Sequence, residues 1–194
     1  MATKQISIEG VNVEFLQVKI EGTSPLIVNN FSQKAKNQIL DKQMKKAKTG
    51  KEAKDPQADY KGSLYLFKDK KRTGFVSRGF KAAMVRAGKQ LDYTMTDLRG
   101  RFFIVPDEGD LTEIKGKHRM REDRVTIGNG ITDIRFRAEY PDWNAVLTIR
   151  FNSRAISEEE LVKLVEQAGF SCGIGEWRPE KSNSGSYGTF KIAG

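Results

Sequence analysis

Residues 145–169 read AVLTIRFNSRAISEEELVKLVEQAG, and this stretch predicts a strand followed by a helix. In Ala145 to Phe151, apolar side chains alternate with polar ones, which is the period-two pattern of a half-buried strand. Ser157 and the three glutamates after it form a capping box that starts a helix. The apolar stripe of that helix consists of Leu161, Leu164, Val165 and Ala168. Gly169 is suited to the position after a helix, so the helix is expected to end at Ala168.

A similar combination of strand and helix is predicted earlier in the chain. Val11 to Ile20 alternates as a strand, and Ser77 to Lys89 reads as a helix with Ser77 as its N-cap. The apolar stripe of this helix consists of Phe80, Met84 and Ala87. Three further strands are predicted, at Arg101 to Val105, Ile131 to Ala138 and Thr189 to Ile192. We expect Ile131 to Ala138 to pair with residues 145–151 as a hairpin, through a turn at Glu139 to Asn144.

This order of elements, two halves that each contain strands around a helix, predicts an α+β fold. The finer expectation is a ferredoxin-like or RRM-like antiparallel sheet with two helices on one face, in a single domain over residues 1–194 with inserted basic loops. A lysine-rich insertion covers about residues 33–59, where Ile39, Leu40 and Met44 predict a short helix. A basic loop covers about residues 108–128.

The charge balance favours polyanionic partners. The 194 residues carry a formal net charge of +9 and a sequence pI near 9.6, which points to nucleic acid before anionic membrane. No apolar run approaches the ~20 residues of a membrane helix. The first ten residues lack the apolar segment of a secretory signal. We therefore expect a cytoplasmic protein, of a bacterium or a phage-infected host cell, without a membrane partner.

Two residue counts exclude most hydrolase mechanisms. Cys172 is the only cysteine, so an intrachain disulfide and a Cys-based zinc site are excluded. His118 is the only histidine, so a Ser-His-Asp triad or a His-based metal site would have to use it. We expect no metal, no cofactor and no enzymatic activity.

Basic residues at three places are candidates for contact with phosphate. On the predicted hairpin, Arg135, Arg137 and Arg150 have the parity of the sheet face that the helices leave open, where RRM-like sheets bind single strands. The aromatic residues usual on such a face are not evident, which favours backbone contact over base stacking. The candidates in the basic loop are Lys117, His118, Arg119 and Arg121, and those on the first helix are Arg78 and Lys81.

A glycine-rich segment near the end of the sequence is a further candidate. Its glycines permit close backbone approach, so that exposed amides can meet phosphate oxygens. These glycines are Gly173, Gly175, Gly185 and Gly188. Arg178 adds a cation, and Trp177 and Tyr187 are the candidates for stacking on a base. The segment is not a P-loop, because no Gly-Lys-Ser or Gly-Lys-Thr follows it.

Three short motifs carry a resemblance to a known family. They are Thr23-Ser-Pro-Leu-Ile27 after the first strand, Phe75 to Ala83 at the start of the first helix, and Gly173 to Phe190 near the end. In this order they resemble motifs of the RAMP superfamily, the ferredoxin-like CRISPR subunits of the Cas7 and Cas6 kind. For Cas7-like members, the resemblance implies a helical filament along single-stranded RNA. Small standalone relatives encoded by phages match the length of this chain better, and for those single-stranded DNA is an equal candidate.

The favoured interpretation is a sequence-tolerant, single-stranded nucleic-acid-binding protein that assembles along its ligand as a homo-oligomer or filament. One alternative is a metal-independent endoribonuclease of the Cas6 kind, with His118 as acid or base and Lys117 or Tyr187 assisting. Another alternative is a phage structural or assembly protein whose positive charge contacts packaged DNA. The sequence does not distinguish DNA from RNA as the ligand.

Overall fold

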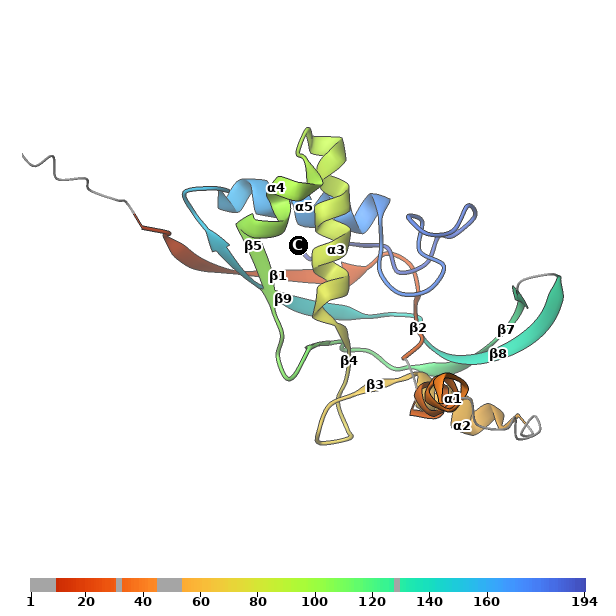
Figure 1. The fold of residues 1–194 in the computed structure, drawn as a ribbon. Helices are drawn as coiled ribbons and strands as arrows, with labels where there is room; N and C mark the ends of the chain where they lie inside the picture. The colour runs from red at the N-terminus through yellow and green to blue at the C-terminus, as the bar shows by residue number, and fades with distance from the viewer. Residues whose placement is uncertain (1–9, 31–32, 45–53, 128–129) are drawn as a thin grey trace, which may run out of the picture.

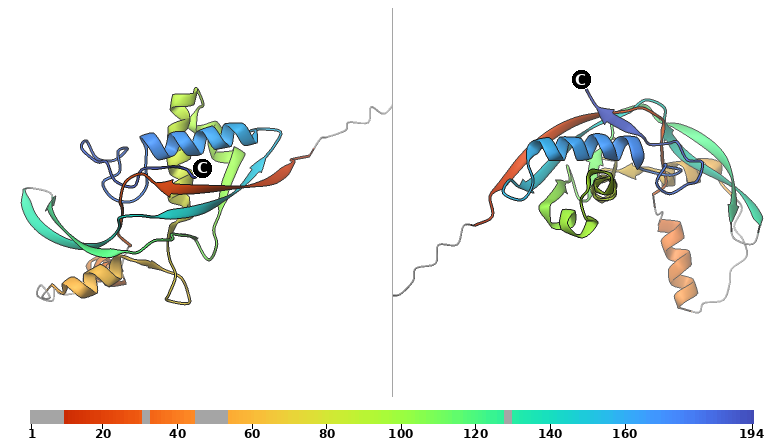
Figure 2. Two further views of the ribbon diagram at one scale, coloured as in Figure 1. Left: turned by 180° about the vertical axis from the view of Figure 1, so that it is seen from behind. Right: turned by 90° about the horizontal axis from the view of Figure 1, so that it is seen from above.

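The computed structural model describes residues 10–30, 33–44, 54–127 and 130–194. Its centre is an antiparallel sheet of four strands, in the spatial order β10-β1-β9-β5. These strands are β1 (Val13–Gly22), β5 (Phe102–Val105), β9 (Asn144–Asn152) and β10 (Phe190–Ile192). Two helices, α3 (Ser77–Ala87) and α5 (Glu158–Ser171), lie on the same side of this sheet (Figures 1 and 2).

The central unit follows the order β1-α3-β5-β9-α5-β10 along the chain, which is strand, helix, strand twice over. In each half, the two strands are separated in the sheet by one strand of the other half. The prediction of an α+β fold with antiparallel strands is confirmed. The arrangement is consistent with a ferredoxin-like sheet.

The core lies between this sheet and its two helices. Phe80 of α3 and Leu164 of α5 are completely buried, as are Leu147 and Ile149 on the facing side of β9. The capping box predicted at Ser157 is present, with both of its hydrogen bonds. A 3₁₀ turn (Gly88–Leu91) and α4 (Met95–Arg101) lead from α3 to β5. With the helices on one side, the side chains on the other face of the sheet remain exposed along β1.

The strand predicted at residues 131–138 belongs to a second antiparallel sheet, not to the predicted hairpin. This second sheet has the order β2-β8-β7, formed by β2 (Leu26–Val28), β7 (Arg119–Ile127) and β8 (Ile131–Tyr140). The predicted pairing of 131–138 with 145–151 is wrong, because β8 pairs with β7 and β2 whereas β9 pairs with β1 and β5. Residues 141–143, within the predicted turn, thus connect two different sheets.

The predicted basic loop over 108–128 is also corrected, because it contains β6 (Leu111–Glu113) and β7. In β7, charged residues lie opposite charged residues of β8, as in the pairs Arg119–Glu139 and Asp123–Arg135. Such a strand lacks the apolar alternation by which strands are predicted. β6 belongs to a third sheet of order β3-β4-β6, with β3 (Tyr65–Leu66) and β4 (Thr73–Val76).

The lysine-rich insertion contains α1 (Gln33–Gln43) and the start of α2 (Pro56–Ser63). The Asp55 carboxylate caps α2, and this helix packs on β8. The short helix predicted at Ile39, Leu40 and Met44 is confirmed as α1, which stands away from the body of the protein (Figure 2, right). Residues 45–53 of the predicted insertion lie outside the described residues. No helix that the structure describes is long and apolar enough to cross a membrane.

Candidate nucleic-acid interface

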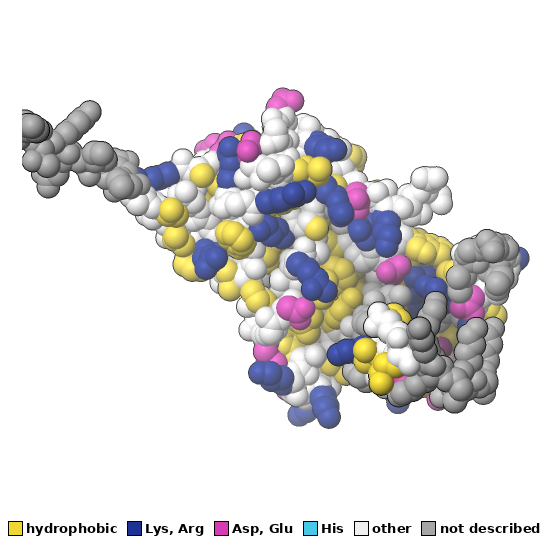
Figure 3. Space-filling view, viewed as in Figure 1, with side chains coloured by type: hydrophobic (Ala, Val, Ile, Leu, Met, Phe, Trp, Pro, Cys, Tyr) yellow, Lys and Arg dark blue, Asp and Glu magenta, His cyan; other side chains and the backbone are white. Residues whose placement is uncertain are grey.

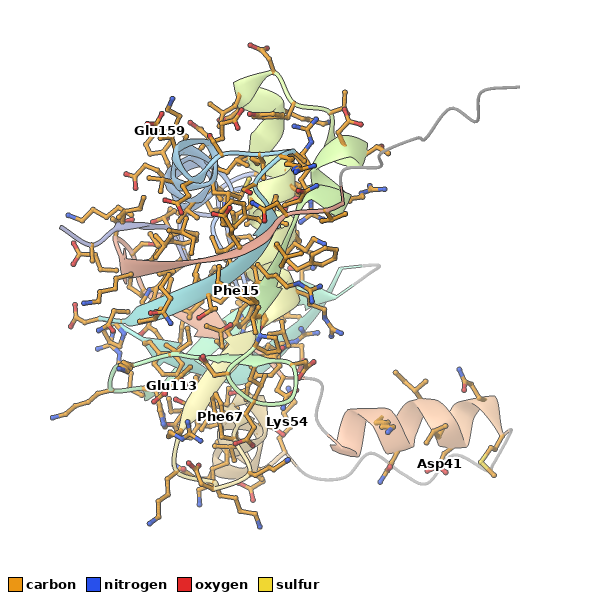
Figure 4. All side chains as sticks on the ribbon, turned by 90° about the vertical axis from the view of Figure 1, so that its left-hand side faces the viewer. Phe15, Asp41, Lys54, Phe67, Glu113 and Glu159 are labelled. Atoms are coloured by element: carbon orange, nitrogen blue, oxygen red, sulfur yellow. The ribbon has the colours of Figure 1, made fainter. Side chains whose placement is uncertain are left out.

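The open face of the four-stranded sheet carries two aromatic rings with an arginine between them. Phe15 of β1 is in register with Arg150 of β9, and Arg150 is in register with Phe103 of β5. Phe15 keeps 62% of its surface exposed and Phe103 keeps 41%. The guanidinium carbon of Arg150 lies 5.1 Å from the centre of the Phe103 ring, within the range of a cation–π contact. We call Phe15, Arg150 and Phe103 the sheet-face row; Figure 4 labels Phe15 on β1.

The sheet-face row points to solvent because successive side chains of a strand point to opposite faces of the sheet. In β1 the inward side chains, among them Val18 and Ile20, are buried, so Phe15 with the opposite parity points to solvent. In β9, Ile149 and Phe151 are buried, and Arg150 between them points outward. An exposed phenylalanine has no polar group to hydrate, so two of them beside one arginine form a surface suited to a flat ligand.

Lysines continue the same surface beyond the row. Lys19 lies four residues after Phe15 on β1, about 14 Å away at the usual rise of a strand. Lys19, Lys115 and Lys117 line a hollow of about 920 Å³ next to the sheet. Backbone hydrogen bonds of 2.9 Å in both directions tie Lys115 to Asn144 at the start of β9. The rings and the lysines therefore follow one another across one face.

Carboxylates on this surface are fewer than cations. Glu21 and Asp142 also line the hollow. The Glu21 carboxylate forms an ion pair with Lys191 of β10, with an N–O distance of 2.9 Å. The surface as a whole thus keeps an excess of positive charge.

Lys81 supports the edge of the sheet-face row. Its Nζ lies 3.8 Å from the centre of the Phe103 ring and donates a hydrogen bond of 2.8 Å to the carbonyl oxygen of Arg99. Burial lowers the pKa of Lys81. Two cations, Lys81 and Arg150, therefore lie against one ring. The predicted phosphate contact of Lys81 stays a prediction.

A second group of predicted residues meets where the glycine-rich segment lies on the β7–β8 hairpin. This loop–hairpin cluster consists of Arg119, Arg121, Arg137, Asp123, Glu139 and Glu176. Arg137 donates to Asp123 at 2.7 Å and lies 3.5 Å from Glu176. Arg121 donates to Asp123 at 2.7 Å and to Glu139 at 2.6 Å. Three arginines and three carboxylates leave the cluster without formal net charge, so it offers little attraction to a polyanion.

The placement of Arg137 is a correction to the sequence analysis. Its side chain is only 2% exposed, and that of its partner Asp123 is 3% exposed. Arg135 and Arg137 were expected on the open sheet face because their strand was expected to pair with residues 145–151. Their strand is β8, which belongs to the second sheet, so this expectation is wrong. Arg135 lies on the hairpin, 43% exposed and 3.9 Å from Asp133. Of the three arginines assigned to that face, Arg150 occupies it.

The pKa shifts of Arg121 and Glu139 favour the charged forms of these two side chains. Burial by itself lowers the pKa of Arg121, but hydrogen bonds to Asp123, Glu139 and Tyr187 outweigh burial and raise it. Burial likewise favours the neutral form of Glu139, yet hydrogen bonds from Arg119 and Arg121 hold its pKa below the ordinary value. The Arg121 guanidinium is thus engaged with partners within the protein.

The two aromatic residues predicted to stack on a base lie over this cluster. The guanidinium carbon of Arg121 is 4.7 Å from the Tyr187 ring centre and 5.7 Å from that of Trp177. Arg137 lies 5.5 Å from the Trp177 ring centre. The two rings contact each other edge to face, with centroids 6.1 Å apart. The protein's own arginines therefore engage these rings, and base stacking by Trp177 and Tyr187 stays a prediction.

The glycines of the C-terminal segment serve its own packing. A Cβ on Gly175 would lie 2.4 Å from the carbonyl oxygen of Ile27, and one on Gly188 would lie 1.9 Å from that of Ile174. Both glycines have positive φ, 77° and 67°. The amides of Gly173, Gly185 and Gly188 donate to backbone carbonyls of Ala168, Ser182 and Pro25. These three amides are not free for phosphate, although the sequence predicts such a role.

The remaining predicted residues are spread over the molecule. Arg78 is exposed in the first turn of α3, and Lys117 is exposed beside the hollow. Arg178 donates to the carbonyl oxygen of Gly175 and shares the Glu180 carboxylate with Arg86. Figure 3 shows Lys and Arg side chains on the α3 side as separate groups rather than as one stripe. The predicted residues therefore do not converge on a single groove.

His118 lies at the entry to β7 in a tyrosine-lined setting. Its Nδ1 forms a hydrogen bond of 2.6 Å with the hydroxyl of Tyr60, and its ring centroid lies 5.4 Å from that of Tyr140. Burial lowers the pKa of His118, so its neutral form is favoured near pH 7. No group of three or more metal-ligating side chains occurs among the described residues.

Phe15, Phe103 and Lys19 are not among the site residues that the sequence predicts. The signal for Phe15 was its parity: it shares a face of its strand with Gln17 and Lys19, opposite to Val18 and Ile20. Phe103 stands between Phe102 and Ile104, and an unbroken apolar run does not reveal which residue faces outward. Its exposure follows from its place on the edge strand β5.

Comparisons with known proteins found a similarity of fold to a solved structure, but no match to a family profile or a curated protein. Its fold is similar to the crystal structure of Cmr6 from Pyrococcus furiosus, with 10% sequence identity and a TM-score of 0.44. The match covers 95% of this chain and 100% of the other. A similarity of this size concerns the outline of the fold alone.

Proposed function

We propose that this chain binds single-stranded nucleic acid across the open face of its four-stranded sheet. The observation that carries the proposal is the sheet-face row, in which Phe15 and Phe103 expose their rings on either side of Arg150. Unpaired bases stack on such rings, and each stacked base contributes about 1–3 kcal/mol to binding. The arginine and the lysines beyond it neutralise phosphates.

This surface favours unpaired strands of any sequence. Its principal groups are rings, aliphatic side chains and point charges, and these read the face of a base instead of its hydrogen-bonding edge. In a duplex the faces of the bases are stacked on one another, so Phe15 and Phe103 cannot reach them. We therefore expect single strands to be preferred over duplex, with DNA and RNA both candidate ligands.

The phosphate contact of Arg150 has a measurable signature. Arg150→Ala should reduce the slope of log affinity against log salt by about one, because one phosphate contact and its released counterion are lost. The measurement is fluorescence anisotropy of a labelled strand of about ten nucleotides at several salt concentrations. Arg86→Ala is the matched control, since Arg86 pairs with Glu180 on the helical side, and its slope should equal that of the wild type. Equal slopes for all three proteins would count against the contact.

The ribonuclease alternative makes a separate prediction. His118 is engaged with Tyr60 and favours its neutral form, so a proton donor at this position is scarce near pH 7. We expect labelled RNA to remain intact without metal, both with the wild type and with His118→Ala. Cleavage by the wild type that disappears in the variant would establish nuclease activity instead.

A further inference from the structure

Lys81 reaches from the helical layer around the edge of the central sheet to Phe103. Lys81 belongs to α3, on the covered side of the sheet, whereas Phe103 of the edge strand β5 exposes its ring on the open side. The Lys81 Nζ lies 3.8 Å from the centre of the Phe103 ring. A cation this close to the centre lies over a face of the ring, because an approach in the ring plane would collide with the ring's edge. One face of Phe103 is therefore already covered.

The same ammonium group is also held at the end of helix α4. The Lys81 Nζ donates a hydrogen bond of 2.8 Å to the carbonyl oxygen of Arg99, which lies in the last turn of α4. The last four carbonyls of a helix have no partner within the helix, and lysine side chains near the helix end can bond to them. A helix carbonyl and a π-face, both partly negative, thus fix one ammonium group between them.

We propose that Lys81 is a positioning residue, which holds Phe103 as a one-sided platform for a single unpaired base. The inference rests on the proposed function, because it concerns the ring on which a base is proposed to stack. An exposed ring that turns freely loses conformational freedom when a base stacks on it. The contact with Lys81 restricts the Phe103 ring before the strand arrives, so less freedom is lost on binding.

The ammonium group also changes the charge that the free face of the ring presents. The face of an aromatic ring carries partial negative charge, which disfavours direct face-to-face stacking with a base. A cation over one face attracts the π electrons toward itself, so the opposite face becomes less negative. A base on that opposite face then meets less repulsion. Arg150 lies farther from the ring centre, at 5.1 Å, and its side chain is exposed for the phosphate of the same strand.

This role differs from the phosphate contact that the sequence predicts for Lys81. Loss of a phosphate contact lowers the salt slope by about one, and its effect on affinity adds to the effect of losing the Phe103 ring. A positioning residue acts through the ring, so its removal has no effect on affinity once the ring is absent. The salt slope and a double variant therefore distinguish the two roles.

Anisotropy titrations with a strand of about ten nucleotides measure both quantities. Lys81→Ala should weaken binding about threefold to tenfold, the range of one cation–π contact, with the salt slope of the wild type. The same substitution should have no effect in the Phe103→Ala protein. Lys81→Arg should keep most of the affinity, because a guanidinium also binds at a ring face and donates hydrogen bonds. The matched control is Lys89→Ala, in the 3₁₀ turn after α3, which removes an exposed charge and should leave the affinity unchanged.

Proton NMR of the free protein tests the contact without nucleic acid. The ε-methylene protons of Lys81 should be shifted upfield by the ring current of Phe103, and this shift should disappear in the Phe103→Ala protein. Unshifted protons in the wild type would overturn the inference. So would a salt slope lowered by about one in the Lys81→Ala protein, or additive losses in the double variant. Full affinity of the Phe103→Ala protein would overturn the stacking itself, and the role of Lys81 with it, although the upfield shift would remain.

Discussion

Phe15→Ala and Phe103→Ala are each expected to lower the affinity for a short single strand about fivefold to a hundredfold, which corresponds to the ~1–3 kcal/mol of one base stacked on a ring. Both rings are exposed on the same sheet face, so neither substitution removes buried packing to any large extent. Anisotropy titrations with a strand of about ten nucleotides measure the effect. The salt slope should stay as in the wild type, because no charge is removed.

The matched control for these two variants is Phe170→Ala. Phe170 is more exposed than either ring but lies on α5, away from the proposed interface. On a strand too short for two copies, its replacement should leave the affinity unchanged. If Phe15→Ala and Phe103→Ala bind as tightly as Phe170→Ala does, base stacking on the sheet is excluded.

Asp123→Ala is expected to lower the free energy of unfolding by about 3–5 kcal/mol, the usual cost of removing one partner from a buried ion pair. Among the described residues, Arg137, 2% exposed, would keep Glu176 at 3.5 Å as its carboxylate partner, beside the Trp177 ring at 5.5 Å. The Nε of Arg137 has no hydrogen-bond partner among the described residues even in the intact protein, so its charge is sparsely compensated. Urea unfolding followed by circular dichroism measures the change.

A double variant separates charge burial from packing. Asp123→Leu with Arg137→Met removes both charges, and much of the lost stability should return, because a buried pair is often replaced by apolar residues at little cost. Arg150→Ala, at an exposed position, should change the free energy of unfolding by less than about 0.5 kcal/mol. A change of only that size for Asp123→Ala would mean that the cluster is a solvated surface feature, in which case its arginines are again candidates for phosphate contact.

The central sheet was largely predictable because its elements follow simple periodicities. The strand at 145–151 and the helix that begins at Ser157 are half buried, so apolar alternation and the capping box mark them directly. The helix from Ser77 is marked in the same way by its buried stripe. The spacing of apolar residues in the sequence follows from which side chains are buried, so half-buried elements can be predicted from it.

The pairing of β8 was not predictable from these patterns. Its neighbour β7 satisfies charged side chains with charged partners across the hairpin, as Arg119 does with Glu139. This complementarity becomes visible only when the two strands are in register. Because the pairing of β8 was predicted wrongly, Arg137 was expected on an open face instead of in a buried ion pair. For the same reason, the packing of Gly175 against Ile27 of β2 was not predicted.

The location of the interface is tested most directly by ultraviolet crosslinking. A labelled strand is bound and crosslinked, and the modified peptides are identified by mass spectrometry. We expect crosslinks at Phe15 and Phe103, the two exposed rings of the open sheet face. Crosslinks confined to Trp177 and Tyr187, with the sheet face unmodified, would contradict it and would place the strand on the loop–hairpin cluster.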